Sequence, residues 1–203
     1  MSRSLAVALL LVATACAACG GATPSPSTPA VSPTATPIPL PTLPAAEVPT
    51  FAPRHADPIL EALLPTSLAG ITLTRESQRG TDLSRQSDAL DTMLKALGKT
   101  LADFTVASAY SRSGDLKAQA GAWRVAGANS TRLMPEFIKA VQASSATPLT
   151  VSEVTMAGRT VTQIGAPGQL TQGPLYAFAR DDIVLFVQSP DPKLAEQGLA
   201  EIK

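Results

Sequence analysis

Residues 175–187 read Leu-Tyr-Ala-Phe-Ala-Arg-Asp-Asp-Ile-Val-Leu-Phe-Val, and this stretch decides the fold class. Two apolar segments, 175–179 and 183–187, flank Asp181-Asp182, a pair typical of a tight turn between antiparallel strands. The second segment consists of apolar residues only. Such a run predicts a strand that other parts of the protein cover on both faces. The stretch therefore predicts a β-hairpin whose second strand is buried.

Apolar and polar residues alternate in five further segments upstream, which indicates five more strands. The first begins at Ile71 with the alternation of a half-buried strand, and Gly80 breaks it. The other four strands form two pairs, each joined by turn residues. Ser113-Gly114-Asp115 joins the first pair, and Ala157-Gly158 joins the second. The other four strands are expected at 104–110, 119–125, 151–156 and 159–164.

Four segments have the spacing of amphipathic helices. A short one covers residues 59–64, and the next is expected to be capped by Thr81 or Asp82 and to end at Gly98. A third begins within 129–131, and a last one follows Pro192. Together the elements predict an α+β domain. Its mainly antiparallel twisted sheet has about six or seven strands, with three main helices packed on one face.

The amino-terminal residues have a different character. Arg3 precedes the apolar run 5–15, which has the length of a signal-peptide core and is shorter than the roughly 20 residues that cross a membrane. Small residues and the chain's two cysteines, Cys16 and Cys19, follow. This pattern resembles the lipobox of bacterial lipoproteins, in which a cysteine is coupled through sulfur to diacylglycerol. The resemblance implies lipidation at Cys19, with Cys16 as the alternative, and an extracytoplasmic protein held on the cell membrane by lipid.

Ten prolines lie between Pro24 and Pro53, with Ser and Thr in most of the gaps. Such a segment buries too little apolar surface to fold, so it predicts a disordered, extended spacer. A ligand for proline-binding domains and a glycosylated stalk are the alternatives. The expected organisation is a signal peptide at 1–18, a Pro/Thr/Ser-rich tether at 19–54 and one globular domain at 55–203.

The domain has few residues suited to catalysis or cofactor binding. His55, the only histidine, stands at the junction with the tether and is interpreted as a solvated linker residue. Because the domain lacks any other histidine and any cysteine, Ser-His-Asp and Cys-His catalysis and zinc sites are not expected. Gly165, Gly168 and Gly173 match no phosphate-binding pattern and are interpreted as a flexible loop. Sixteen basic and sixteen acidic residues cancel, which disfavours a nucleic-acid partner.

Carboxylates provide the remaining candidates for chemistry. Asp88 and Asp91 could hold a cation, but a solvated helix face is the favoured interpretation. Asp181-Asp182 with Asp191 could bind calcium, but a turn is favoured there. A hydrolytic acid/base pair would need the fold to bring two glutamates, Glu136 and Glu153, together. We therefore expect no metal and no cofactor.

Aromatic and arginine side chains near one another in the sequence could line a groove for an anionic or sugar-like ligand. The favoured interpretation is that the aromatic rings are core residues and the arginines face water. The residues concerned are Tyr110, Trp123, Tyr176 and Phe178, with Arg112, Arg124 and Arg180.

These observations predict a membrane-anchored, non-enzymatic protein whose domain binds a ligand or a partner outside the cytoplasm, with the binding residues unknown. An envelope structural or assembly factor, whose open sheet edge pairs with another chain, is the alternative. A hydrolase that uses only carboxylates is the least favoured.

Overall fold

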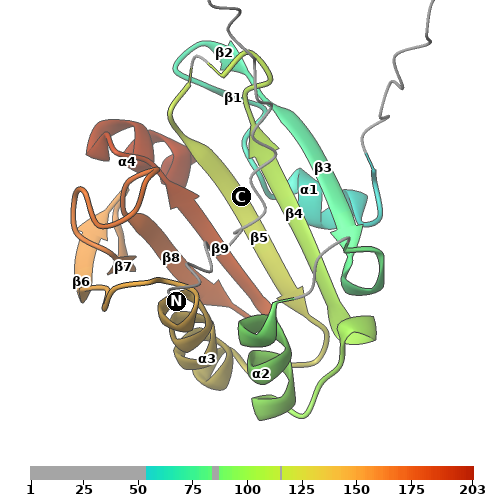
Figure 1. Cartoon of the computed structure of the whole chain (residues 1–203). Helices are drawn as coiled ribbons and strands as arrows, with labels where there is room; N and C mark the ends of the chain where they lie inside the picture. The colour runs from blue at the N-terminus through green and yellow to red at the C-terminus, as the bar shows by residue number, and fades with distance from the viewer. Residues whose placement is uncertain (1–53, 84–86, 115) are drawn as a thin grey trace, which may run out of the picture. The chain divides into compact units, whose positions relative to one another are not determined.

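A seven-stranded antiparallel sheet forms the centre of the protein in a computed structural model, which describes residues 54–83, 87–114 and 116–203 (Figure 1). The strand order is β3-β4-β5-β9-β8-β7-β6. Two further strands of two residues each, β1 (Ser67–Leu68) and β2 (Ile71–Thr72), pair separately. The α+β class and the antiparallel sheet are thus confirmed. The main strands are β3 (Thr74–Arg79), β4 (Phe104–Tyr110), β5 (Gln119–Val125), β6 (Val151–Met156), β7 (Arg159–Ile164), β8 (Leu175–Arg180) and β9 (Ile183–Gln188).

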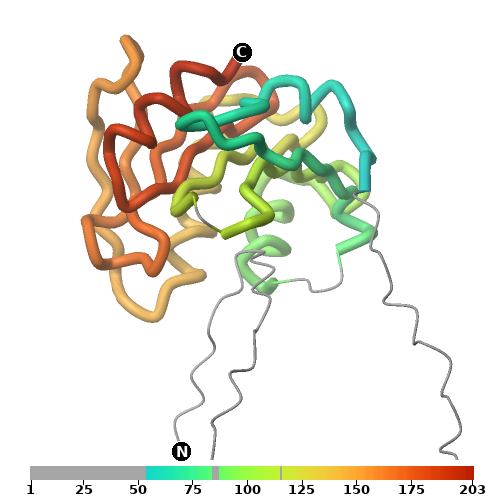
Figure 2. The backbone as a smooth tube through the Cα atoms, turned by 90° about the horizontal axis from the view of Figure 1, so that it is seen from above, coloured from blue at the N-terminus to red at the C-terminus, as the bar shows by residue number. Residues whose placement is uncertain are grey.

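Helices cover both faces of this sheet (Figures 1 and 2). The longer pair, α2 (Asp88–Ala96) and α3 (Ser130–Ala143), packs on one face. The other face is covered by α1 (Pro58–Ala62) and α4 (Pro192–Glu201). Two short 3₁₀ turns, η1 (Gly80–Asp82) and η2 (Leu101–Asp103), precede α2 and β4.

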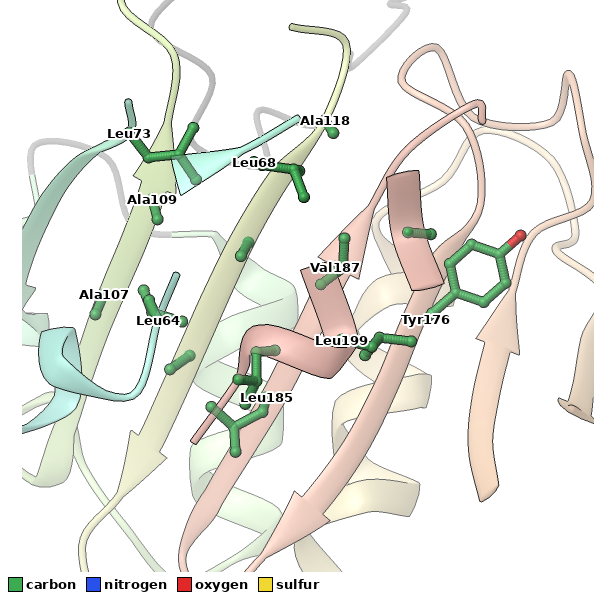
Figure 3. Close-up of a cluster of buried hydrophobic side chains, with 14 of the residues drawn as sticks. Leu64, Leu68, Leu73, Ala107, Ala109, Ala118, Tyr176, Leu185, Val187 and Leu199 are labelled. Atoms are coloured by element: carbon green, nitrogen blue, oxygen red, sulfur yellow. The ribbon is translucent and has the colours of Figure 1, made fainter. Parts of the chain in front are cut away.

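The burial of β9 explains this two-sided arrangement. All six of its residues are buried. Ile183, Leu185 and Val187 face the α1/α4 layer, as Figure 3 shows for Leu185 and Val187, whereas Val184 and Phe186 face α2 and α3. The sequence analysis placed three main helices on one face, but α4 lies on the other, because a strand that is apolar on both sides needs cover on both.

The first expected strand and the second expected helix differ locally from the prediction. Ala69 and Gly70, both with positive φ, make a tight turn between β1 and β2, so the main-sheet strand starts only at Thr74. Thr81 and Asp82 belong to η1 and do not cap α2; the cap is Ser87, whose Oγ accepts from the Leu90 N–H at 3.2 Å. A serine so placed stabilises the first helical turn.

The predicted turns are found in the structure. Ala157 and Gly158 join β6 to β7 with φ of 50° and 72°. Gly98 has φ 70° just after α2, and Gly114 lies in the β4–β5 turn, where Asp115 is outside the described residues. Asn129 caps α3 by accepting from the Thr131 N–H at 2.8 Å. Local sequence therefore determined most element ends.

Gly121 on β5 leaves room for the ring of Phe186 on the neighbouring strand. A Cβ at position 121 would lie 2.3 Å from Phe186 Cζ. The two residues are directly opposite in the register of β5 and β9. The glycine therefore permits a large aromatic side chain at the centre of the α2/α3 face.

Gly121→Ala should therefore lower the free energy of unfolding by about 1–3 kcal/mol, because the added methyl overpacks the core. Phe186→Leu removes the obstructing ring, so the double variant should lose less stability than the two single variants added together. Urea unfolding of the four proteins measures this coupling. Strict additivity would show that the ring does not exclude a side chain at position 121.

Candidate functional site

Trp123 is a core residue and not part of a ligand groove. Its ring makes edge-to-face contacts with Phe104 and Phe137, at centroid distances of 5.4 and 5.1 Å. Phe186 lies at 6.4 Å in a similar orientation. These aromatic residues join β4, β5 and β9 to α3. The interpretation of Trp123 as a core aromatic is confirmed.

Tyr176 and Phe178 lie on the opposite face of the sheet from Trp123, so these aromatic residues share no groove. Tyr176 is buried, and burial raises the pKa of its phenol. The Arg159 guanidinium lies 4.8 Å from the centroid of the Phe178 ring, a cation–π contact. Arg180, at the end of β8, is exposed to solvent as expected.

Tyr110, the last residue of β4, lies in a cross-strand polar row with Gln119 on β5 and Gln188 on β9. Burial raises the pKa of its phenol, and the Glu76 carboxylate raises the pKa further, whereas Arg112 acts in the opposite direction. Gln119, opposite Tyr110, donates to Gln188 on β9 at 3.0 Å. The row offers hydrogen-bonding groups but no nucleophile with an adjacent base.

The aspartates considered for cation binding have structural positions. Asp88 and Asp91 lie in the first turn of α2, where negative charge is favourable. Asp182 accepts from the Gly127 N–H at 3.1 Å, and Asp191 caps α4 by accepting from the Lys193 N–H at 2.9 Å. Within the described ranges no group of three or more His, Cys, Asp or Glu side chains could hold a metal.

The two glutamates considered for hydrolysis have separate surroundings. Glu136 on α3 pairs with Lys139 at 2.6 Å. Glu153 is exposed on β6, at the edge of the sheet. In the part of the chain that the structure describes, no hydrogen bond or ion pair links the two.

The glycine-rich segment between β7 and β8, which the sequence predicts as a flexible loop, makes specific contacts in the structure. The Gln169 side-chain oxygen accepts from the Ala166 N–H at 2.7 Å and from the Thr150 N–H at 3.1 Å. Gly173 packs so tightly that a Cβ there would lie 2.3 Å from the Pro190 nitrogen. These contacts fix the segment at both ends.

Residues 54–57 form an N-terminal clip along the outer edge of β3. The Ser77 N–H donates to the Arg54 carbonyl at 2.8 Å, and the Ala56 N–H donates to the Ser77 carbonyl at 3.2 Å. His55 thereby makes a short parallel bridge with Ser77. The clip thereby occupies the outward backbone groups of Ser77, whereas those of Arg75 and Arg79, which alternate with it, have no backbone partner in the described ranges.

Buried Glu61 on α1 holds the clip from the side of the helix. One carboxylate oxygen accepts from Ser77 Oγ at 2.5 Å, and the other lies 2.8 Å from His55 Nδ1. The interpretation of His55 as a solvated linker residue therefore holds only in part: its side chain is half exposed, but it is bonded to a buried carboxylate. An isolated buried carboxylate costs free energy, so the hydrogen bonds from Ser77 and His55 stabilise the buried Glu61 side chain.

Asp57 joins the same clip to α1 and to the centre of the sheet. One of its oxygens caps α1 by accepting from the Leu60 N–H at 2.9 Å, and the other forms an ion pair with Arg124 on β5. Sequence reasoning missed this contact, and placed Arg124 in water, because the two residues are 67 positions apart. The β3 edge is thus paired with the clip at Ser77, and the opposite edge of the sheet has no such segment among the described residues.

Strand β6 forms that opposite edge, and its only strand partner among the described residues is β7. Met156 and Arg159 close a two-residue turn, and the Gly165 N–H donates to the Thr150 carbonyl at 2.7 Å. Because bonding alternates along an antiparallel pair, Ser152, Val154 and Met156 bond toward β7. The backbone groups of Val151, Glu153 and Thr155 therefore point outward, and none has a partner in the described ranges.

The side chains of β6 are compatible with a partner. Val151 is 39% exposed, unusual for a large apolar side chain in the described part of this protein. Val154 and Met156 are half-buried against the α1/α4 cluster. Glu153 is the strand's single charged residue. We take the outer edge of β6 as the candidate functional site.

Comparison of the chain with protein-family models, with curated proteins and with solved structures finds no match. No helix in the described ranges is long and apolar enough to cross a membrane. Cys16, Cys19 and the expected tether lie outside the described residues.

Variants of Asp57 should separate the helix cap from the ion pair. Asp57→Asn keeps an oxygen that caps α1, whereas Asp57→Ala removes both interactions and leaves Arg124 unpaired. We expect the alanine variant to be less stable than the asparagine variant by about 1 kcal/mol, measured by urea unfolding. Equal stability would mean that the cap contributes nothing.

Proposed function

We propose that this chain is a lipid-anchored extracytoplasmic protein whose domain binds an extended segment of a partner protein along β6, without catalysing a reaction. The observation that carries the proposal is the difference between the two sheet edges. The clip pairs with β3 at its outward residue Ser77, whereas the three outward residues of β6 have no such segment beside them in the described ranges. A strand with unpaired backbone groups is a template for another strand.

The strength expected of such pairing is modest. Each backbone hydrogen bond contributes about 0.5–1.5 kcal/mol net, and association itself costs several kcal/mol. Three outward residues offer three donors and three acceptors, so the edge alone supports weak, reversible binding. Additional affinity would come from contacts of Val151, Val154 and Met156 with the partner's side chains.

The expected anchor and tether fit this role. Acyl chains on Cys19, or on Cys16 as the alternative, would confine the domain to the membrane surface. An extended spacer of 35 residues, at 20–54, would allow it to reach at most roughly 110 Å from that surface. A weak binding edge benefits from this confinement because partners on the same membrane meet at high local concentration.

An envelope assembly factor would use the same edge in a permanent complex and is the second candidate. The edge of β6 supports it equally, so the lifetime of the complex distinguishes the two. The carboxylate-dependent hydrolase has weaker support, because Glu136 is paired with Lys139 and Glu153 lies on the edge strand.

Cys19→Ser in the full chain should release the protein from membranes or leave its precursor unprocessed, whereas Cys16→Ser should leave membrane association unchanged. Fractionation and the size of the processed chain measure both effects. The reverse pattern would assign the lipid to Cys16. Membrane association that survives in the double variant would contradict the proposed anchor.

A photo-crosslinking amino acid at Thr155 tests the edge in the full chain, expressed in its native cells. We expect a discrete protein adduct from position 155, because a strand paired with β6 would lie beside it. Gln78 on β3, next to the clip, is the matched control and should give none. No adduct, or equal adducts from the two positions, would contradict binding at β6.

A further inference from the structure

We infer that the segment that pairs with β6 is β6 of a second copy of this chain, antiparallel, with Val154 facing the partner's Val154 on a two-fold axis. The inference rests on the proposed function, whose partner it identifies. It follows from the order of residues along β6 and from the direction in which their backbone groups point.

Backbone geometry limits how two β6 strands can pair. Val151, Glu153 and Thr155 point their N–H and C=O groups outward, so each of them must face one of the same three residues. If the two-fold axis passed between two residues, each residue with outward backbone groups would face a partner residue whose backbone groups point toward its own β7, and no hydrogen bond could form. Three symmetric registers with useful overlap remain, centred on Ser152, on Glu153 or on Val154.

The side chains distinguish these registers. Centring on Glu153 sets two carboxylates directly opposite each other, which is unfavourable. Centring on Ser152 sets Val151 against Glu153 and leaves Val154, Thr155 and Met156 unpaired within the strand, whereas centring on Val154 leaves only Val151 unpaired. Centring on Val154 pairs valine with valine and Glu153 with Thr155. It also separates the two carboxylates to a diagonal position about 7–8 Å apart.

The Val154 register also continues the core of the domain. Val154 and Met156 already pack against the α1/α4 cluster but remain half exposed. In a pair without direct hydrogen bonds, facing Cα atoms approach to about 4.5 Å, so the two valine side chains would touch. Met156 would then lie beside Ser152 of the partner, on the same face. The apolar layer would extend across the axis into a second copy.

Glu153 limits the strength of this pairing without preventing it. Two carboxylates at the diagonal distance repel weakly when solvent is nearby, so neutralising them should increase dimer formation about two- to threefold. The carboxylate also makes the edge less adhesive toward other strands. Pairing through β6 is therefore expected mainly where copies are concentrated.

Cysteine variants of the full chain in native membranes can determine the register. Val154→Cys should form a disulfide-linked dimer under mild oxidation, because Cα atoms about 4.5 Å apart lie within disulfide range. Glu153→Cys and Ser152→Cys are exposed neighbours that control for random collision, and they should give much less dimer. The unmodified chain provides the background from its own cysteines.

Two second-site changes test the backbone pairing and the charge. Thr155→Pro, added to Val154→Cys, removes an outward N–H that β7 does not use, so it should abolish the dimer and leave the fold intact by circular dichroism. Glu153→Gln in the same background should raise the dimer yield about two- to threefold. Glu201→Gln, which neutralises a charge on α4, should not raise it.

Each outcome supports or overturns the inference. A dimer specific to Val154→Cys, lost with Thr155→Pro, supports it. A stronger dimer from Glu153→Cys or Ser152→Cys overturns the Val154 register. No specific dimer from any variant overturns pairing with a second copy. In that case an adduct from position 155 with a different protein would leave the proposed function standing, and no adduct would remove both.

Discussion

The burial of β9 on both faces is the constraint on which the rest of the structure depends. Its apolar residues alternate between the α1/α4 layer and the α2/α3 layer, so the chain must supply a helical cover for each. A hairpin alone could not meet this requirement, since β9 also needs β5 on its other side. The small residues of β5 follow from that proximity, because Gly121 leaves space for the Phe186 ring. The centre of the sheet is thus fixed by side-chain packing.

The edges of the sheet are governed by a different requirement, the satisfaction of backbone hydrogen bonds. At β3 the clip supplies partners from the chain itself, and Glu61 and Asp57 hold the clip through side-chain contacts. At β6 no described segment performs that task. Among the described residues, one edge of the sheet is therefore paired at its centre with a segment of the same chain, and the other edge has no such partner. This asymmetry, and not a cluster of reactive groups, is what the structure contributes to the question of function.

Periodicity in the sequence predicted the strands, most turns and the fold class, because alternation and helical spacing report local backbone conformation and burial. It did not predict which face α4 would cover, because an amphipathic helix has the same sequence pattern whichever face of the sheet it packs on. It also failed at the start of α2, where Thr81, Asp82 and Ser87 are all acceptable caps and only packing selects Ser87. The clip was missed for a related reason: His55, Asp57 and Glu61 look solvated until residues 16 to 67 positions away are brought beside them. The sequence could predict that the sheet has an open edge but not that β6 forms it, because the order of strands in a sheet depends on contacts between distant residues.

A weak edge and a membrane anchor make sense together when their free energies are compared. Confinement by a flexible tether typically gives an effective concentration on the order of a millimolar, at which pairing worth about 4 kcal/mol is half complete. A few backbone hydrogen bonds and one valine contact reach about that size before the cost of association is counted, so pairing through this edge depends on confinement. The same edge would stay unpaired at micromolar concentration in free solution, and the Glu153 carboxylate would reinforce that difference. A stronger, more apolar edge would also pair at the membrane, but it would pair equally well with any exposed strand met during export. The moderate chemistry of β6 therefore fits a protein whose partner is selected by location as much as by affinity.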